Sequence, residues 1–515
     1  TAVNNGDADY NVLIGQDAGT GGTGAMAKCI AIGGNAMNST ATNAQTGTVA
    51  IGYDSLTALT NGAKNIAIGY EAQLSQTTGS RNTVIGHSAM RTADGGEDYN
   101  TVIGSEAGYY INNDASHDNV IIGKNALQGG TGTILGNVAI GSNAMDAIVD
   151  NNQTGTVAIG TDSLGALTSG AGNTVIGYQS GDALTTSGYN TVVGHQALTT
   201  EDVGTHSTAI GYQALHSQNT ASAGVAGNTA VGLESGYHNV TGTNNTYLGY
   251  KSGTGASGQS NSNNTAVGFE SLKVITTGGQ NVVVGKNSGD SITDGGYNTF
   301  IGYYAGATTT SVTRAVAIGT EAMESGNVTN DAIGTIAIGS KSLHDLTSGS
   351  SNVAIGYESA SFISTGGSNT LLGYESGKGA SGQNYSETTA IGYRSAYSLT
   401  SGASNTFVGR QSGLTLTTGH NNVGVGNNAL AVSTNAGYVV AIGNNAMSGA
   451  DVTAGADGSV AVGASALTAL TSGAGNVAVG YQTLDGIQGA HYNTAVGHQA
   501  LTAQNTNGNI ANTGI

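Results

Sequence analysis

Hydrophobic residues recur along the whole chain in a short fixed pattern around a glycine. An aliphatic residue followed by Gly, as in "NTVIGYQSGDALTTSGYNTVVGHQAL" (173–198), occurs 28 times between Gly15 and Gly497. Sixteen of the 27 intervals between these glycines are 17 residues long, and the others are 18 to 21. We take each Gly as position 0 and number the flanking residues from it. A fixed short period over a whole chain is typical of a solenoid or array.

Each position of the repeat has its own chemistry. Position −1 is Ile, Val or Leu in all 28 copies, position −3 is Val, Ile or Thr in all 28, and position −4 is Asn in 19. The nine residues around the Gly predict two very short strands broken at the Gly, with the β-branched residues at −3 and −1 sharing one face. All extra residues of the longer copies fall between +4 and the next −4, as in 216–227, which predicts a surface turn.

Seventeen residues are too few for a helix pair or a propeller blade, but they suit one coil of a parallel β-solenoid. Equivalent residues of successive coils would then stack about 4.8 Å apart, and the full set of coils would form a rod roughly 130 Å long. The fold class that we predict is therefore all-β: a β-roll of about 28 coils in one continuous repeat domain over residues 1–515.

Position −2 is apolar as well, with only Gly424 lacking an apolar side chain. Since a strand with one solvated face should be polar there, we expect one face to fill the narrow core and the −2 row to be covered by another copy of the chain. The prediction is a parallel homotrimer, with a homodimer or higher filament as the alternative. A coil that covers this row with its own loop also remains open. The interface residues predicted on this basis are Ala158, Val175, Val192, Val283, Phe300, Leu371 and Phe407.

The strings "VAIGSNAM" (138–145) and "VAIGTEAM" (316–323) resemble the head repeats of YadA-like trimeric autotransporter adhesins. The fuller pattern "NTAVGYxxL" is similar to repeats in bacteriophage tail fibres. The resemblance covers all 28 copies and implies a left-handed β-roll in which three chains wind around one axis, with the −2 row facing it. The period is longer than that of the adhesin heads, and no coiled-coil stalk or C-terminal barrel is recognisable in these residues.

Composition supports one continuous hydrogen-bonded array, because Pro is absent from all 515 residues while Gly accounts for 86. The net charge of −18 would repel nucleic acid and anionic lipid, and no apolar run of membrane-spanning length occurs. One cysteine, Cys29, excludes an intrachain disulfide. Because the chain begins with Thr1 and ends within the pattern, we expect a processed product or a segment of something longer.

Little in the sequence predicts chemistry. None of the ten His residues lies in a zinc or catalytic motif, and paired carboxylates at +2 are interpreted as a solvated stripe. The segments "ADGGEDYN" (93–100) and "TDGGYN" (293–298) resemble calcium-binding turns but lack the nonapeptide period, so no metal or cofactor is predicted. Tyrosines at +1 could stack on one another or on sugar rings. They are Tyr53, Tyr70, Tyr178, Tyr212, Tyr250, Tyr303, Tyr357, Tyr374, Tyr393 and Tyr481.

The function that we expect is non-enzymatic, structural and adhesive: the shaft or a shaft segment of a bacteriophage tail fibre that presents host-surface glycan recognition. The protein would then lie on the virion surface or outside the cell. A bacterial surface adhesin or other extracellular filament is the alternative, and a polysaccharide depolymerase is the weaker one. An ice-binding solenoid is disfavoured, because Thr at −3 alternates with Val and Ile and is therefore expected to point inward.

Three contacts test the register. The −4 Asn residues should form a stacked ladder, with Asn281 and Asn298 within hydrogen-bond reach, because Asn can bond along such a stack. Cys29 occupies the same position and is expected to be structural rather than reactive. At position +2, opposite charges in consecutive coils should pair: Lys251 between Glu234 and Glu270, and Arg394 beside Glu375.

Overall fold

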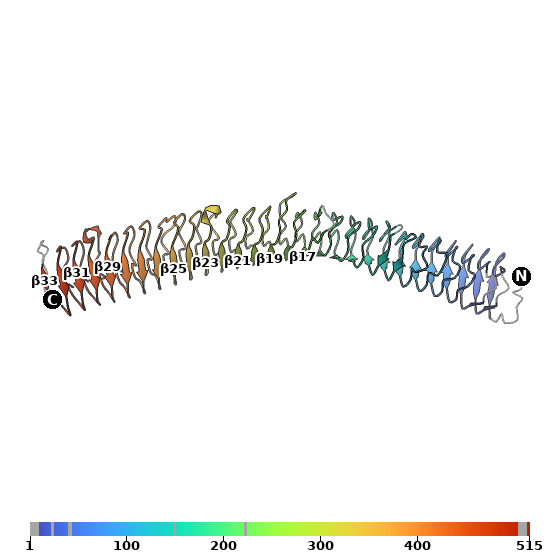
Figure 1. Cartoon of the computed structure of the whole chain (residues 1–515), viewed down its shortest axis with the longest axis horizontal. Coiled ribbons are helices and arrows are strands. Elements are labelled where there is room, and N and C mark those ends of the chain that lie inside the picture. The colour runs from blue at the N-terminus through green and yellow to red at the C-terminus, as the bar shows by residue number, and fades with distance from the viewer. Residues whose placement is uncertain are drawn as a thin grey trace. The chain divides into compact units, whose positions relative to one another are not determined.

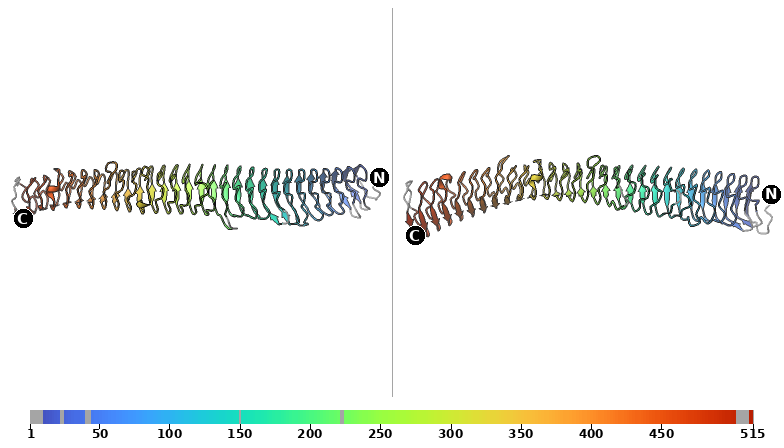
Figure 2. Two further views of the ribbon diagram at one scale, coloured as in Figure 1. Left: turned by 90° about the horizontal axis from the view of Figure 1, so that it is seen from above. Right: turned by 45° about the horizontal axis from the view of Figure 1, so that its top comes forward.

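The computed structural model describes residues 10–21, 25–39, 44–148, 151–220, 224–502 and 512–514. The chain divides into two compact units, residues 1–261 and 262–515, and each is described by itself. In each unit, short parallel strands stack along one edge, and the turns that connect them lie along the opposite edge (Figure 1; Figure 2). The protein is therefore an all-β parallel β-solenoid of about 28 turns, as the period predicts.

The described part of the first unit contains 14 strands of three residues and four of two residues. They are β1 (Val12–Ile14), β2 (Met26–Ala27), β3 (Ile30–Ile32), β4 (Gln45–Thr46), β5 (Val49–Ile51), β6 (Ile66–Ile68), β7 (Thr83–Ile85), β8 (Thr101–Ile103), β9 (Val120–Ile122), β10 (Ile134–Leu135), β11 (Val138–Ile140), β12 (Gln153–Thr154), β13 (Val157–Ile159), β14 (Thr174–Ile176), β15 (Thr191–Val193), β16 (Thr208–Ile210), β17 (Thr229–Val231) and β18 (Thr246–Leu248).

The described part of the second unit contains 14 more strands of three residues, one of two residues, and two short 3₁₀ helices. They are β19 (Thr265–Val267), β20 (Val282–Val284), β21 (Thr299–Ile301), β22 (Val316–Ile318), η1 (Asn330–Ala332), β23 (Ile336–Ile338), β24 (Val353–Ile355), β25 (Thr370–Leu372), β26 (Thr389–Ile391), β27 (Thr406–Val408), β28 (Val423–Val425), β29 (Val440–Ile442), η2 (Ala454–Ala456), β30 (Val460–Val462), β31 (Val477–Val479), β32 (Thr494–Val496) and β33 (Thr513–Gly514).

Strand pairing confirms the register read from the repeat. In β13 and β14, for example, Ala158 pairs with Val175 and Ile159 pairs with Ile176, so equivalent positions of consecutive coils face each other. The same one-to-one pairing relates β20 to β21. Every position of the repeat therefore forms a row of side chains that runs along the stack. None of the helical segments in the described residues is long or apolar enough to cross a membrane.

In the described residues the main strand of a coil runs from −3 to −1, and in four coils a two-residue strand precedes it: β2, β4, β10 and β12. The second strand predicted after the Gly is not formed. The residues that follow Gly160 turn instead, with Asp162 and Leu164 in the left-handed region at φ 55° and 52°. A strand requires φ near −120°, so these residues cannot continue the ladder. The turn reverses the chain at once, which keeps the core only a few side chains wide.

Glycine at position 0 is required by the approach of neighbouring backbones. Gly160 has φ +138°, and a Cβ added to it would lie 2.2 Å from the carbonyl oxygen of Gly177 in the next coil. A side chain would therefore meet both a forbidden φ and a fixed backbone atom. This explains why the repeat has Gly at this position in every copy.

The two faces of the strand are the reverse of those predicted. From β3 to β32 the middle residue, at −2, is fully buried within the single chain, whereas the residues at −3 and −1 are partly exposed. The prediction that the −2 residues form an outward interface is therefore wrong, because these residues fill the interior of the coil and cannot contact a partner. This correction applies to Ala158, Val175, Val192, Val283, Phe300, Leu371 and Phe407, each of which has no exposed surface.

Side-chain size is balanced inside the coil between −2 and +4. Phe407 at −2 is followed by Gly413 at +4, where an added Cβ would lie 2.8 Å from the Phe ring. Coils with Ala at −2 often have a large residue at +4, as Ala158 with Leu164. In both of these coils the two residues are buried, the glycine included. The −2 and +4 side chains thus lie in one small space, and a large residue at one of the two positions is often matched by a small one at the other.

The Asn ladder is confirmed. Asn298 donates to the side-chain oxygen of Asn281 from both its backbone N and its Nδ2, each at 3.0 Å. Asn281 makes the same two bonds to Asn264. Cys29 occupies this row and is fully buried, and its backbone N–H donates to Asn11 Oδ1 at 2.8 Å. Burial, the largest cause, raises the pKa of the Cys29 thiol.

Candidate functional site

The outward side of the strands is the surface with most apolar exposure in each unit. We call it the outward strand face and define it by the side chains at −5, −3, −1 and +1. Strand alternation turns −3 and −1 to the side opposite the buried −2 residue, and the residues at −5 and +1 flank the strand at its two ends. Ile301 at −1 is 37% exposed and Val282 at −3 is 41% exposed. A strip of Ile, Val, Leu and Thr side chains is therefore open to solvent in the single chain, beside a +1 row that is rich in aromatic residues.

Threonine at −3 belongs to this exposed strip. Thr191 and Thr246 are exposed, and Thr174 and Thr208 are half-buried. The expectation that these residues point inward is wrong, because the −2 side chain occupies the interior and strand alternation turns −3 the other way. The orientation of Thr at −3 therefore gives no reason to disfavour an ice-binding array.

The +1 row forms one edge of the outward strand face, and its rings stack on one another. Tyr53 stacks on Tyr70 with centroids 5.6 Å apart, and Tyr70 stacks on His87 at 5.3 Å. Tyr357, Tyr374 and Tyr393 continue the same geometry at 5.2 and 5.4 Å. Tyr178, Tyr212 and Tyr481 each stack on a histidine of a neighbouring coil. Stacking of this kind covers ring faces and leaves edges and hydroxyls to solvent.

The remaining +1 tyrosines have other neighbours. Tyr303 meets Tyr304 edge-on at 4.4 Å and has the ammonium of Lys286 5.6 Å from its ring, while Tyr250 lies 5.5 Å from Nζ of Lys251. Sugar stacking on the +1 row stays a prediction. It would need a free ring face, which the end ring of a stacked run can offer more readily than a ring inside it.

Sequence reasoning did not single out position −5, where exposed Tyr, His and Arg side chains occur in some of the coils. Tyr189 is 65% exposed and stacks on His206 at 5.2 Å. Arg81 places its guanidinium 5.0 Å from the ring centroid of Tyr99, and Arg314 lies 5.8 Å from Tyr297. The sequence did carry a signal, since −5 is Tyr, Arg, Lys or His in several copies.

Two of the charge pairs predicted at +2 are confirmed. Lys251 Nζ lies 3.2 Å from Glu234 Oε2, and Arg394 Nε lies 2.6 Å from Glu375 Oε2. Lys378 also bonds Glu375 at 2.8 Å and Glu358. Partial burial alone would raise the pKa of Glu375, but the hydrogen bonds from Lys378 and Arg394 outweigh it and lower that pKa. The Lys251–Glu234 pair is partly exposed and contributes at most about 1 kcal/mol, so its main value is as evidence for the register.

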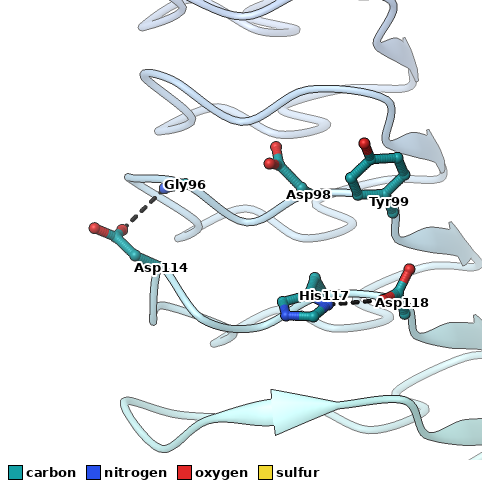
Figure 3. A pocket seen from close by; sticks show the side chains of 6 residues that line it. All are labelled: Gly96, Asp98, Tyr99, Asp114, His117 and Asp118. Carbon is teal, nitrogen blue, oxygen red and sulfur yellow. Dashed lines mark hydrogen bonds and ion pairs between the residues drawn. The ribbon is translucent and has the colours of Figure 1, made fainter.

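An acidic depression lies on the first unit between two coils. It encloses about 400 Å³ and is lined by Gly96, Asp98, Tyr99, Asp114, His117 and Asp118. Figure 3 shows Asp98 and Tyr99 on one coil above His117 and Asp118 on the next, with Asp114 reaching toward Gly96. The Gly96 N–H donates to Asp114 Oδ1 at 2.9 Å, and His117 Nδ1 lies 2.7 Å from Asp118 Oδ2.

Two groups of side chains in the described residues have ligand atoms close enough to hold one metal ion. Asp94, Glu97 and Asp114 lie beside the acidic depression, and Glu321, Glu324 and His344 lie in the second unit; within each group the atoms are all within 4.8 Å of one another. The two carboxylates of the second group already have partners within the protein. Glu324 bonds His344 at 3.0 Å, and Glu321 bonds Lys341 at 3.4 Å.

Comparison with known proteins adds no family to this description. No protein-family model matches the chain, and no curated protein sequence matches it. The outward strand face and the acidic depression are the surfaces whose geometry bears on function.

Proposed function

We propose that the chain is a non-enzymatic structural element of an extracellular or virion fibre, in which copies of the same chain pack in parallel through the outward strand face. The observation that carries the proposal is the strip of Ile, Val, Leu and Thr at −3 and −1 that the single chain leaves open along its strands. Contiguous apolar strips of this kind mark interaction sites in soluble proteins.

The area of the strip is sufficient for self-association. Full burial of an aliphatic side chain at ~1.5–3 kcal/mol corresponds to roughly 60–120 Å² of apolar surface at 25 cal/mol per Å². Side chains that are about one-third exposed, such as Ile391 at 38%, therefore leave roughly 20–45 Å² each. Two per coil over about a dozen coils approach the ~800 Å² that each partner buries in a stable interface.

A second copy is the partner that fits this strip best. The strip repeats with the period of the coil, and a parallel, in-register copy presents the same rows at the same spacing. We propose a homotrimer as the assembly, in keeping with the resemblance of the repeat to YadA-like heads and tail-fibre repeats. The interface then consists of the −3 and −1 rows, with the −5 and +1 side chains at its margins. A homodimer is the alternative that the same surface allows.

An ice-binding face is not proposed, although Thr at −3 points outward. The adjacent −1 row has only Ile, Val or Leu in all 28 copies, so hydroxyl groups form at most one broken row on this face. Adhesion to a host glycan remains part of the proposal, with the end rings of the +1 row as the contact.

The test is the oligomeric state of the purified chain and of a charge-substituted variant. Ile391, Ile442 and Val479 at −1 are 38%, 38% and 36% exposed, and glutamate at each would place uncompensated charge in the proposed interface. Sedimentation velocity should show a trimer for the unmodified chain and a monomer for the triple variant, with an unchanged far-UV circular dichroism spectrum.

The matched control places the same three charges on the turn side of coils in the same unit. Ser401, Thr418 and Ser472 are exposed, occupy position +9, and lie outside the outward strand face. Their replacement by glutamate should leave the trimer intact. A stable monomer for the unmodified chain at micromolar concentration, or a trimer that survives the −1 substitutions, would overturn the proposal.

A further inference from the structure

Glu97 is a buried carboxylate with an oxygen that has no partner. The residue has no exposed surface, and its Oε1 accepts no hydrogen bond. The other oxygen, Oε2, accepts from the Gly95 N–H at 3.1 Å and from Gln76 Nε2 at 3.2 Å. Burial, the largest cause, raises the pKa of this carboxyl. Buried polar groups are almost always satisfied, so an unpartnered carboxylate oxygen calls for a ligand.

Glu201 shows how the same fold satisfies a buried carboxylate with hydrogen bonds alone. It also has no exposed surface. Its oxygens accept from the Gly204 N–H at 2.8 Å, from Gln218 Nε2 at 2.9 Å and from Thr220 Oγ1 at 3.0 Å. Glu97 lacks such a set of donors. The side chains that lie closest to it in the cluster are other carboxylates.

Asp94 and Asp114 bring two more carboxylates to Glu97 from the same coil and the next one. One oxygen of each of the three groups lies within 4.8 Å of the others. A Cβ on Gly95 would lie 1.7 Å from Asp114 Oδ1, so glycine at this place allows the Asp114 carboxylate to lie over the loop. None of the ion pairs found among the described residues involves these three carboxylates, and two basic residues of the same two coils pair with other carboxylates: Arg91 with Glu71, and His117 with Asp118.

We propose that Asp94, Glu97 and Asp114 bind a hard divalent cation, with Ca²⁺ as the best fit. All three ligands are carboxylates, whereas zinc sites are built mainly from Cys and His. Ca²⁺ takes six to eight oxygen ligands in a flexible arrangement. Asp94 and Asp114 are exposed, so water can complete the shell from the solvent side. The bound ion would give Glu97 the partner that it lacks and would join two consecutive coils through their turns.

The chain contains a related loop that serves as an internal comparison. Residues 293–298, "TDGGYN", share Asp-Gly-Gly with 93–100 but lack the Glu that follows. In that loop Asp294 Oδ1 accepts from Thr293 Oγ1 at 3.2 Å. The carboxylates needed for a cation are therefore present in one of the two loops only, and the proposal is confined to residues 94–114.

Binding is tested on the full chain after removal of divalent ions with a chelator. Isothermal titration with CaCl₂ in about 0.15 M NaCl, which screens diffuse binding to surface acids, should show one saturable site per chain. Three carboxylates with an open solvent side suggest a Kd of roughly 10⁻⁴–10⁻³ M. Glu97→Gln and Asp114→Asn should each weaken binding at least tenfold, and Ca²⁺ should raise the Tm of the unmodified chain but not that of either variant.

Glu201→Gln and Asp294→Asn are the controls, and both should retain the Ca²⁺ affinity of the unmodified chain. Should Glu97→Gln fail to fold, Asp114→Asn carries the test alone, because its side chain is on the surface. Absence of a saturable site in the unmodified chain, or a Kd in Asp114→Asn equal to that of the unmodified chain, would overturn the proposal. The outcome is independent of the oligomeric state on which the proposed function depends.

Discussion

Replacing Asn281 with leucine should remove one step of the corner ladder at a cost that the geometry allows us to estimate. Leucine matches the branched shape of Asn but can neither donate nor accept. Asn281 has no exposed surface, donates Nδ2 to the Gly295 carbonyl at 3.0 Å and accepts the Asn298 N–H at 3.0 Å. The amide of Asn298 would keep its bond to the Val312 carbonyl at 2.7 Å.

Two buried backbone groups, the Asn298 N–H and the Gly295 carbonyl, would therefore lose the partner that Asn281 provides. An unsatisfied buried group costs about 1–3 kcal/mol, so the free energy of unfolding of this region should fall by about 2–6 kcal/mol. A repeat array need not unfold in one step, and a global transition can hide a local loss. Native-state hydrogen exchange of the peptide that contains Asn298 is thus the direct measurement, supported by urea denaturation.

Asn427→Leu is the matched control. Asn427 donates to the side chain of Asn444 in the next coil at 3.1 Å, but this contact is exposed. Water can replace the lost bond there, so the change should stay within about 0.5 kcal/mol. A loss below about 1 kcal/mol for Asn281→Leu, with unchanged exchange at Asn298, would show that the ladder does not hold the corner.

Two further outcomes follow from the backbone and from the single cysteine. Gly177→Ala should lower the Tm sharply and cost more than about 2 kcal/mol, because a Cβ would lie 2.4 Å from the Gly194 carbonyl oxygen at φ +140°. Gly155→Ala, where a Cβ meets nothing within 4 Å, should cost only about 1 kcal/mol, and equal Tm shifts would contradict the steric argument. Cys29 should react with a thiol reagent far more slowly than a free thiol in native buffer and rapidly in denaturant, because burial both shields the sulfur and raises its pKa; rapid native labelling would refute this.

The sequence was sufficient to predict the period, the register and the contacts that depend on them. A fixed spacing of the Gly anchors places equivalent residues over one another, so the Asn281–Asn298 bond and the Lys251–Glu234 pair could be predicted without coordinates. These contacts run between coils. They depend only on which residues of consecutive coils are equivalent, and the spacing of the Gly anchors gives this equivalence directly.

The orientation of the strand was predicted wrongly, because hydrophobicity alone does not distinguish two apolar faces. A better signal was the balance of size between −2 and +4. Phe300 is followed by Gly306, whose added Cβ would lie 2.5 Å from the ring, and Ala337 is followed by Leu343. Two positions whose volumes compensate occupy one enclosed space. The rows at −3 and −1 show no such compensation, as expected of side chains that face outward.

The repeat pattern could not predict the site around Glu97, for a different reason. The turn from +4 to −4 varies in length and composition, so no copy predicts another there. Only the structure shows that Glu97 is turned inward while Asp94 and Asp114 stay on the surface. The segment 93–100 had the composition of a cation-binding turn, but its third carboxylate comes from the following coil.

The direction of the backbone hydrogen bonds has a mechanical consequence. Within each unit, the ladder joins each coil to the next, as in the bond from the Val282 N–H to the Asn298 carbonyl at 2.8 Å. A pulling force along the stack therefore acts parallel to these bonds and can break them sequentially, a few at a time. A single chain would yield coil by coil under tension. Side-by-side contact between chains distributes the load over many coils at once, so tensile strength would belong to the assembly.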